Sequence, residues 1–192
     1  MTQAPARLRA GASVRHHAGM WRRILKQFRS WRGRAAAQHA SAAAGGKPPL
    51  MVALDSAAHT WLFRVPRSRV AITDFCAMIE KRLPPGYATL DALRAFQVAF
   101  DELLTNVVAH TTEFPDEPIE VLLKRDPEKV LAVIRYRGVP FDPTRQPEPD
   151  TSAKLGDRPI GGLGVHLVRT LMDEFRHTYI AGFNELTLQK RS

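Results

Sequence analysis

Three polar residues in the middle of the chain have a spacing that could support chemistry. Glu102, Asn106 and His110 are four residues apart, so a helix would align them along one ridge. At about 100° per residue, that ridge borders the apolar face of the helix, where a cleft could form. Mg²⁺ accepts amide oxygens such as that of Asn106 alongside phosphates, and Glu102 could act as a base on a hydroxyl or water. Local hydrogen bonds at the rim of the core would also explain each residue taken alone.

A glycine-rich run, Pro159-Ile-Gly-Gly-Leu-Gly164, leads into a predicted apolar helix. Glycines let the backbone approach an anion, and the free N–H groups of a helix N-terminus attract phosphate. The run is not a Walker A loop, because no Gly-Lys-Ser/Thr follows. It is not a dinucleotide fingerprint either, because the third glycine is missing and no strand leads in. Taken alone, the run is explained more simply as a flexible hinge.

The elements that must position these groups follow from apolar periodicity and turn residues. Successive strands are joined by short turns, which indicates antiparallel pairing. The fold class is therefore α+β, a two-layer sandwich with helices on one face of a mostly antiparallel sheet. The predicted strands are His59–Val65, Ile119–Lys124, Val130–Arg137, Arg176–Ile180 and Glu185–Gln189, and the predicted helices are Arg67–Leu83, a segment capped by Thr89 that runs to His110, and Gly162–Phe175.

Residues 142–160 are polar and rich in proline. This is long for a connection within a compact domain, so the segment is either a functional lid or disordered.

Charge and cysteine content restrict the classes of function. The net charge is +9, but residues 1–50 hold ten Lys or Arg and no acidic residue, which leaves 18 basic and 19 acidic residues for 51–192. The folded part therefore gives no charge argument for nucleic acid. The single cysteine, Cys76, excludes an internal disulfide framework and a multi-cysteine zinc site. No apolar run is long enough to span a membrane, and a cytoplasmic location is expected.

The composition divides the chain into a basic tail, residues 1–50, and a globular domain, residues 51–192. Most of the tail has too few large apolar groups to fold. Within residues 19–32, Trp21, Ile24, Leu25, Phe28 and Trp31 recur at helical spacing among basic residues, a pattern that suits an anionic membrane surface or an acidic partner. The alternative is an unstructured leader, with Met51 close to the true start.

Taken together, the motifs resemble those of the GHKL (Bergerat-fold) ATPases. Residues 100–110 resemble the Asn-containing box, 136–143 the first glycine box, 161–173 the second glycine box with its helix, and 184–188 the closing strand. Their order and intervals across residues 59–190 are most similar to the anti-sigma-factor serine kinases.

The resemblance implies a role for each matching position. Asn106 would hold Mg²⁺, Glu102 would be the base for the acceptor hydroxyl, and Gly138 would let the backbone pass the adenine. The run Gly161, Gly162, Leu163 and Gly164 would cradle the phosphates of ATP beneath the 142–160 lid. His110, Asp142 and His166 are weaker candidates, because packing or loop capping explains each of them as well.

The resemblance also implies an activity and partners. The protein would sequester a sigma factor and, with Mg²⁺-ATP, phosphorylate a serine on an anti-sigma-factor antagonist. A homodimer is expected, and direct nucleic-acid binding is not.

One position departs from the family pattern. The first glycine box reads Tyr136-Arg137-Gly138, where the family has Asp-x-Gly and the Asp accepts a hydrogen bond from the adenine amino group. Such a bond to a charged group contributes about 1.5–3 kcal/mol, so its loss would weaken nucleotide binding by roughly 10- to 150-fold. The alternative function is therefore a nucleotide-impaired regulator that binds its partners without catalysis.

Overall fold

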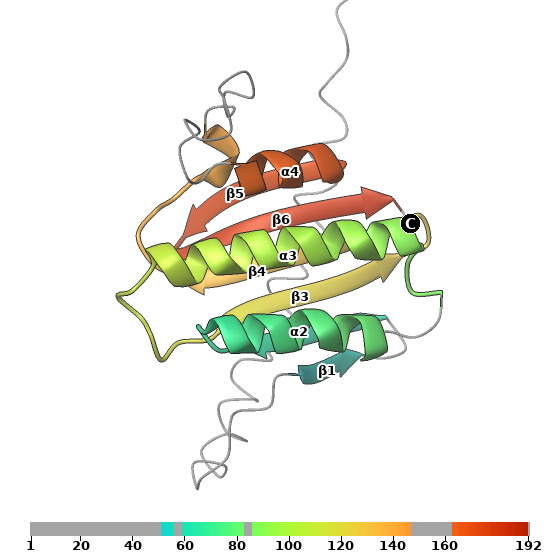
Figure 1. The fold of residues 1–192 in the computed structure, drawn as a ribbon, viewed down its shortest axis with the longest axis horizontal. Helices are drawn as coiled ribbons and strands as arrows, with labels where there is room; N and C mark the ends of the chain where they lie inside the picture. Colours follow the sequence, from blue (N-terminus) through green and yellow to red (C-terminus); the bar gives the residue numbers. More distant parts are fainter. Residues whose placement is uncertain (1–50, 56–58, 83–85, 147–162, 192) are drawn as a thin grey trace, which may run out of the picture. The chain divides into compact units, whose positions relative to one another are not determined.

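The computed structural model describes residues 51–55, 59–82, 86–146 and 163–191. Its strands form one antiparallel sheet in the order β1-β2-β3-β4-β6-β5. The α-helices of the described residues lie on one face of this sheet (Figure 1), which confirms the predicted α+β two-layer fold. The strands are β1 Met51–Asp55, β2 Thr60–Val65, β3 Ile119–Asp126, β4 Lys129–Arg137, β5 Glu174–Ile180 and β6 Phe183–Arg191; the helices are α2 Arg69–Arg82, α3 Leu90–His110 and α4 Leu163–Leu171, with a short 3₁₀ turn η1 Pro143–Arg145.

Helix α3 is the central helix of the layer and carries the predicted polar ridge. Thr89 caps its N-terminus as predicted, with its hydroxyl accepting a hydrogen bond from the N–H of Ala92 at 3.3 Å. At the other end, the N–H of Thr111 donates to the carbonyl of Val107 at 3.0 Å. The face towards the sheet is apolar over the whole length of the helix, which fixes the direction of the polar ridge.

The core lies between the sheet and helices α2 and α3. Phe63 of β2 packs edge to face on Phe75 of α2, and Phe75 packs in the same way on Phe100 of α3. All three rings are fully buried. The chain of aromatic contacts joins both helices to the sheet and holds α3 at a fixed height above the strands.

The helix predicted over Gly162–Phe175 is wrong at its C-terminal end. Helix α4 stops at Leu171, and β5 begins at Glu174. Met172 and Phe175 both pack against the core, so the apolar pattern continues although the backbone has become extended. In addition, β1 is an edge strand beyond those predicted from the sequence, and Val70, an apolar residue in the first turn of α2, is 67% exposed.

No helix within the described ranges is both long enough and apolar enough to cross a bilayer.

Candidate functional site

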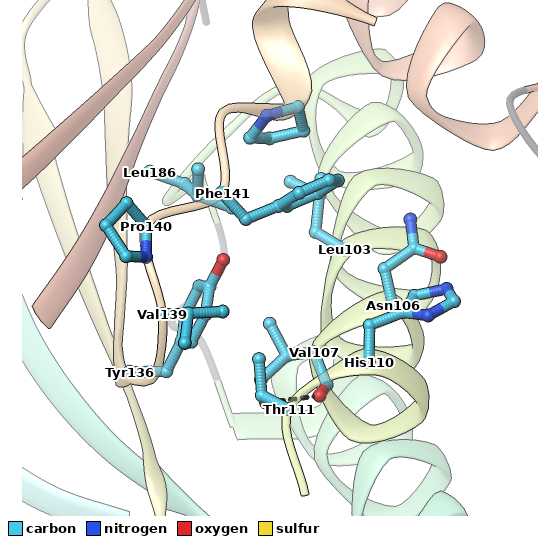
Figure 2. A pocket seen from close by; sticks show the side chains of 11 residues that line it. Leu103, Asn106, Val107, His110, Thr111, Tyr136, Val139, Pro140, Phe141 and Leu186 are labelled. Carbon is cyan, nitrogen blue, oxygen red and sulfur yellow. Dashed lines mark hydrogen bonds between the residues drawn. The ribbon is translucent and has the colours of Figure 1, made fainter. Parts of the chain in front are cut away.

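A pocket lies between α3 and the loop that follows β4 (Figure 2). Its cavity of about 100 Å³ can hold several waters or a small flat ring. Side chains of α3 form one wall, and the loop with the ends of β4 and β6 forms the other. The lining residues are Leu103, Asn106, Val107, His110, Thr111, Tyr136, Val139, Pro140, Phe141, Pro143 and Leu186.

The predicted ridge borders this pocket. Asn106 and His110 lie side by side on the α3 wall (Figure 2). The side chain of Asn106 lines the pocket and makes no hydrogen bond to any other described residue. Glu102, one turn earlier, does not line the cavity.

Glu102 instead contacts the first turn of α4. A Cβ built on Gly164 would overlap the Glu102 carboxylate, so the absence of a side chain at residue 164 permits this approach. A carboxylate is favoured at this position, because the N-terminus of a helix carries partial positive charge. The mid-chain helix and the later glycine run thus lie together in space, although Gly161 and Gly162 are outside the described residues.

Leu163 and Gly164 are the two residues of the run that the structure describes. Leu163 is the first residue of α4, and its side chain is 51% exposed. Gly164 follows within the same turn, where backbone N–H groups have no partner inside the helix. This turn has the polarity that an anion requires.

Tyr136 stands where the family pattern has an acid. Its ring is 2% exposed and lines the pocket, with the hydroxyl pointing into the space below Phe141 (Figure 2). Burial raises the pKa of Tyr136 to about 12, against a smaller opposing effect of the Arg67 charge. The group is therefore a neutral hydroxyl at pH 7. It makes no hydrogen bond to any residue that the structure describes.

The loop that forms the second wall is held by Asn184 of β6. The amide of Asn184 accepts a hydrogen bond from the N–H of Phe141 at 3.0 Å and donates one to the carbonyl of Val139 at 2.8 Å. Its oxygen also lies 2.8 Å from Nε2 of His177. Because that oxygen can only accept, Nε2 must carry the proton. Asn184 appears in the sequence as part of a closing strand, and its role as the anchor of this wall was not predicted.

Arg67 is a second anchor that sequence patterns did not reveal. Its guanidinium donates to the carbonyls of Glu117 at 2.8 Å, Thr111 at 3.0 Å and Arg137 at 2.7 Å, and to the hydroxyl of Thr111 at 2.6 Å. One side chain thus joins the end of α3 to the end of β4, beside the pocket. Its partners lie 44 to 70 residues away in the chain, so no local spacing could have shown them.

Two of the weaker candidates, Asp142 and His166, do not line the pocket. Asp142 caps η1, accepting hydrogen bonds from the N–H and hydroxyl of Thr144 at 2.9 and 2.6 Å. Partial burial alone would raise the pKa of Asp142, but the Thr144 hydrogen bonds and the nearby His177 and Arg145 hold it below its ordinary value. His166 lies on α4, outside the pocket lining.

Gly138 also has a packing explanation. A Cβ at this position would lie 3.1 Å from Cγ2 of Thr111, closer than ordinary van der Waals contact. Its carbonyl accepts a hydrogen bond from the Tyr179 hydroxyl at 3.2 Å. The glycine lets the end of β4 approach the end of α3, and this approach narrows the pocket.

Arg169 of α4 holds the start of the predicted lid. One nitrogen of its guanidinium donates to the carbonyls of Pro143 at 3.0 Å, Thr144 at 2.5 Å and Gln146 at 2.7 Å. The chain therefore enters residues 147–162 from a fixed point beside α4. Those residues, which hold most of the predicted lid, lie outside the described ranges.

The chemistry of the pocket can be compared with that of a Mg²⁺-bound nucleotide. The Asn106 side suits the metal and the phosphates, whereas the Tyr136 side suits the nucleotide base less well. Among the described residues, no cluster of three His, Cys, Asp or Glu could hold a metal alone. An amide oxygen from Asn106 suits a Mg²⁺ that takes its other ligands from phosphates and water. The apolar wall suits a flat ring, but the buried ring of Tyr136 occupies part of that space.

Comparison with known proteins agrees with this geometry. A family model described as histidine kinase-like ATPase domain matches residues 68–190. The chain is also similar to the serine/threonine-protein kinase BtrW of Bordetella bronchiseptica, with 33% identity over 94 residues. That match covers 48% of this chain and 66% of the kinase.

Proposed function

Because the chain belongs to the histidine kinase-like ATPase family, we propose that it is an anti-sigma factor with serine-protein kinase activity. It would use Mg²⁺-ATP to phosphorylate a serine on an anti-sigma-factor antagonist. The observation that carries the proposal is the contact between Glu102 and Gly164. In this contact the Glu102 carboxylate lies beside the first turn of α4, which would bind phosphate. Asn106 follows about one helical turn later on α3, and its amide makes no hydrogen bond to another described residue.

Each candidate site residue that the structure describes would have a defined task in phosphoryl transfer. Bound Mg²⁺-ATP would supply the phosphoryl group. Asn106 would hold the metal, the first turn of α4 would bind phosphate oxygens, and Glu102 would accept the proton of the acceptor hydroxyl. Catalysis of this kind depends mainly on positioning and charge stabilisation. The anchors Asn184 and Arg67 supply the positioning by fixing the wall opposite α3.

A protein serine as the acceptor is supported by the similarity to a serine/threonine-protein kinase. The test is to incubate the full chain with Mg²⁺ and γ-labelled ATP together with each purified anti-sigma-factor antagonist of the source organism. We expect one antagonist to become labelled on serine, and we expect Glu102→Gln to abolish the labelling. Asp101→Asn, an exposed carboxylate on the same helix, is the matched control and should retain it. Absence of labelled serine under saturating ATP would reject the kinase activity.

The second candidate is a nucleotide-impaired regulator of the same fold, and the buried ring of Tyr136 favours it. In this case the protein would bind a sigma factor or antagonist without catalysis. Calorimetry with Mg²⁺-ATP separates the two candidates. Micromolar binding to the wild type argues against impairment, whereas binding that appears only in Tyr136→Asp supports it.

The partners complete the proposal. A sigma factor and its antagonist would bind the domain, the chain would form a homodimer, and the basic tail would recruit it to an anionic surface. Sedimentation of the full chain, alone and with the sigma factor, measures how many copies of the chain associate and how many sigma factors they bind. A monomer that binds no sigma factor would reject this part.

A further inference from the structure

The face of the sheet opposite the helices carries an apolar row. Leu62 of β2 pairs with Leu122 of β3, and Leu122 pairs with Val133 of β4, so these side chains lie side by side. Leu131, two residues before Val133, points to the same face. The next residue in β2, Phe63, belongs to the core under the helices. An antiparallel sheet with one solvated face has polar residues on that face, and the four residues of the apolar row break this pattern.

The apolar row is also buried. The exposed fraction of each of its four residues is between 0% and 6%, although the α-helices of the described residues lie on the other face (Figure 1). Neighbouring side chains on an open sheet shield a leucine only in part, because its tip stands away from the strands. The burial therefore requires a cover that the described residues do not supply.

A row of ion pairs borders the apolar row on the same face. Arg135 lies 3.1 Å from Glu120 and 3.0 Å from Glu185, and Arg64 lies 3.8 Å from Glu120. Both glutamates are 8% exposed, so they are shielded from water as well. The charges of this row balance, and they give no net attraction for a charged partner. Any cover must be held mainly by apolar contact.

We propose that residues 19–32 of this chain dock on the apolar row as an amphipathic helix and add a third layer to the fold. The large apolar side chains of this segment, from Trp21 to Trp31, recur at helical spacing. A helix over residues 19–32 would be about 21 Å long. The row crosses three strands, a width of about 10 Å, so one such helix is long enough to cover it.

The position of this segment in the chain favours it over any other occupant. Residues 1–50 lead directly into β1, the edge strand beside β2, which carries Leu62. Residues 33–50 could span about 60 Å when extended, so the linker reaches every part of the face. A segment tethered in this way has an effective concentration on the order of millimolar. A second copy or another protein at micromolar concentration would compete poorly with it.

Docking would leave the basic side of the segment facing outward. On a helix, Arg23 and Lys26 lie opposite the apolar side, so they remain available to an anionic surface. The proposal goes beyond the proposed kinase function and does not involve the nucleotide. Its test can therefore fail while the kinase proposal stands.

Hydrogen exchange of the full chain, followed by mass spectrometry, tests the docking. A helix of this length is marginal alone in water, so slow exchange over residues 19–32 requires packing. We expect exchange there to be at least about 10-fold slower in the wild type than in Leu25→Asp/Phe28→Asp. Arg23→Gln/Lys26→Gln, on the opposite side of the helix, is the matched control and should keep the wild-type protection.

A variant on the sheet tests the docking position. Val133→Asp should speed exchange over residues 19–32 as much as the tail variant does, while α3 keeps its protection. A second measurement does not depend on the folding of Val133→Asp. Leu25→Asp/Phe28→Asp leaves the sheet unchanged but uncovers the apolar row, so it should bind more anilinonaphthalene sulfonate than the wild type does.

Four outcomes would overturn the proposal. They are fast exchange over residues 19–32 in the wild type, protection that persists in Leu25→Asp/Phe28→Asp or in folded Val133→Asp, and dye binding that is the same in the wild type and the tail variant. The fourth is protection that disappears on dilution, because a second copy would then supply the cover. If Val133→Asp does not fold, the exchange and dye binding of the tail variant decide.

Discussion

Tyr136 of β4 and Asn184 of β6 are direct partners across the sheet. Side chains of paired residues point to the same face, so the phenol of the pocket and the amide that holds its wall stand next to each other. The two residues are 2% and 0% exposed. One cross-strand pair therefore supplies both a lining residue of the pocket and the anchor of the adjacent loop. Substitutions at either residue test the same part of the site.

Asn184→Ala should destabilise the fold and loosen the wall. The substitution removes the part-buried hydrogen bonds of the Asn184 amide to the N–H of Phe141 and the carbonyl of Val139, which should lower the free energy of unfolding by about 1–3 kcal/mol. Urea denaturation monitored by circular dichroism measures this change. Thr178→Ala, an exposed residue on the neighbouring strand, should stay within about 0.5 kcal/mol of the wild type. Equal stability of the two variants would show that Asn184 is not an anchor.

Tyr136→Phe should remove part of the alkaline sensitivity of the protein. Burial raises the pKa of Tyr136 from 10.0 to about 12. Between these two values the unfolded chain releases the proton while the folded protein keeps it, so the free energy of unfolding falls as pH rises. The wild type should lose about 2–3 kcal/mol more than the variant between pH 9 and pH 12. Urea titrations at both pH values check this, and parallel losses would contradict the buried position of the phenol.

Glu102→Gln should separate catalysis from binding. The amide keeps the size of the side chain beside Gly164 but cannot accept the proton of a hydroxyl. Removal of a general base lowers the rate by roughly 10²- to 10⁴-fold, while nucleotide affinity should change by less than about 5-fold. Single-turnover phosphate transfer and calorimetry provide the two measurements, with Asp101→Asn as the control. A variant with the wild-type rate would exclude Glu102 as the base.

Asn106→Ala should make nucleotide binding insensitive to the metal. In the wild type, removal of Mg²⁺ with a chelator should weaken binding, because on the proposed function the metal would link Asn106 to the phosphates. The variant lacks this link and should bind with similar affinity in either condition. Val98→Ala, a partly exposed position on the same helix, should retain the wild-type response to the chelator. A full metal response in Asn106→Ala would place the Mg²⁺ ligand elsewhere.

Deletion of residues 1–50 should abolish binding to anionic vesicles. The tail holds ten basic residues and no acidic ones, and each basic group near such a surface contributes about 1 kcal/mol. Binding of the full chain should weaken steeply with added salt because of screening. Co-sedimentation with phosphatidylserine vesicles is the measurement, with phosphatidylcholine vesicles as the control. Equal binding by the truncated protein would contradict this prediction.

The sequence predicted most elements because their signals are local. The stripe from Phe96 to Val108 repeats at helical spacing, and α3 has the predicted cap and end. The end of α4 could not be predicted in this way, because Met172, which follows the last residue of α4, and Phe175 of β5 pack against the same core. Asp173 marks the change, since its N–H donates to the carbonyl of Gln189 at 2.9 Å and starts the pairing with β6.

The candidate site was predictable in part for the same reason. Glu102 and Asn106 carry a recognisable spacing, and Gly164 lies in a recognisable run. The anchors Arg67 and Asn184 act through backbone groups far away in the chain, such as those of Arg137 and Phe141. Those partners are set by sheet register, which a single sequence does not state. The sequence therefore shows the groups suited to chemistry more readily than the groups that hold them in place.

The position of β6 has a consequence for how the protein is made. β6 follows β5 in the sequence but lies between β4 and β5 in the sheet, and β5 pairs with no other described strand. A ribosome releases the chain from its N-terminus, so α3 and β4 emerge well before β6. Until residues 183–191 have emerged, Tyr136 lacks its neighbour and the wall of the pocket lacks its anchor. The nascent protein should therefore acquire this pocket late, in the same step that completes the sheet.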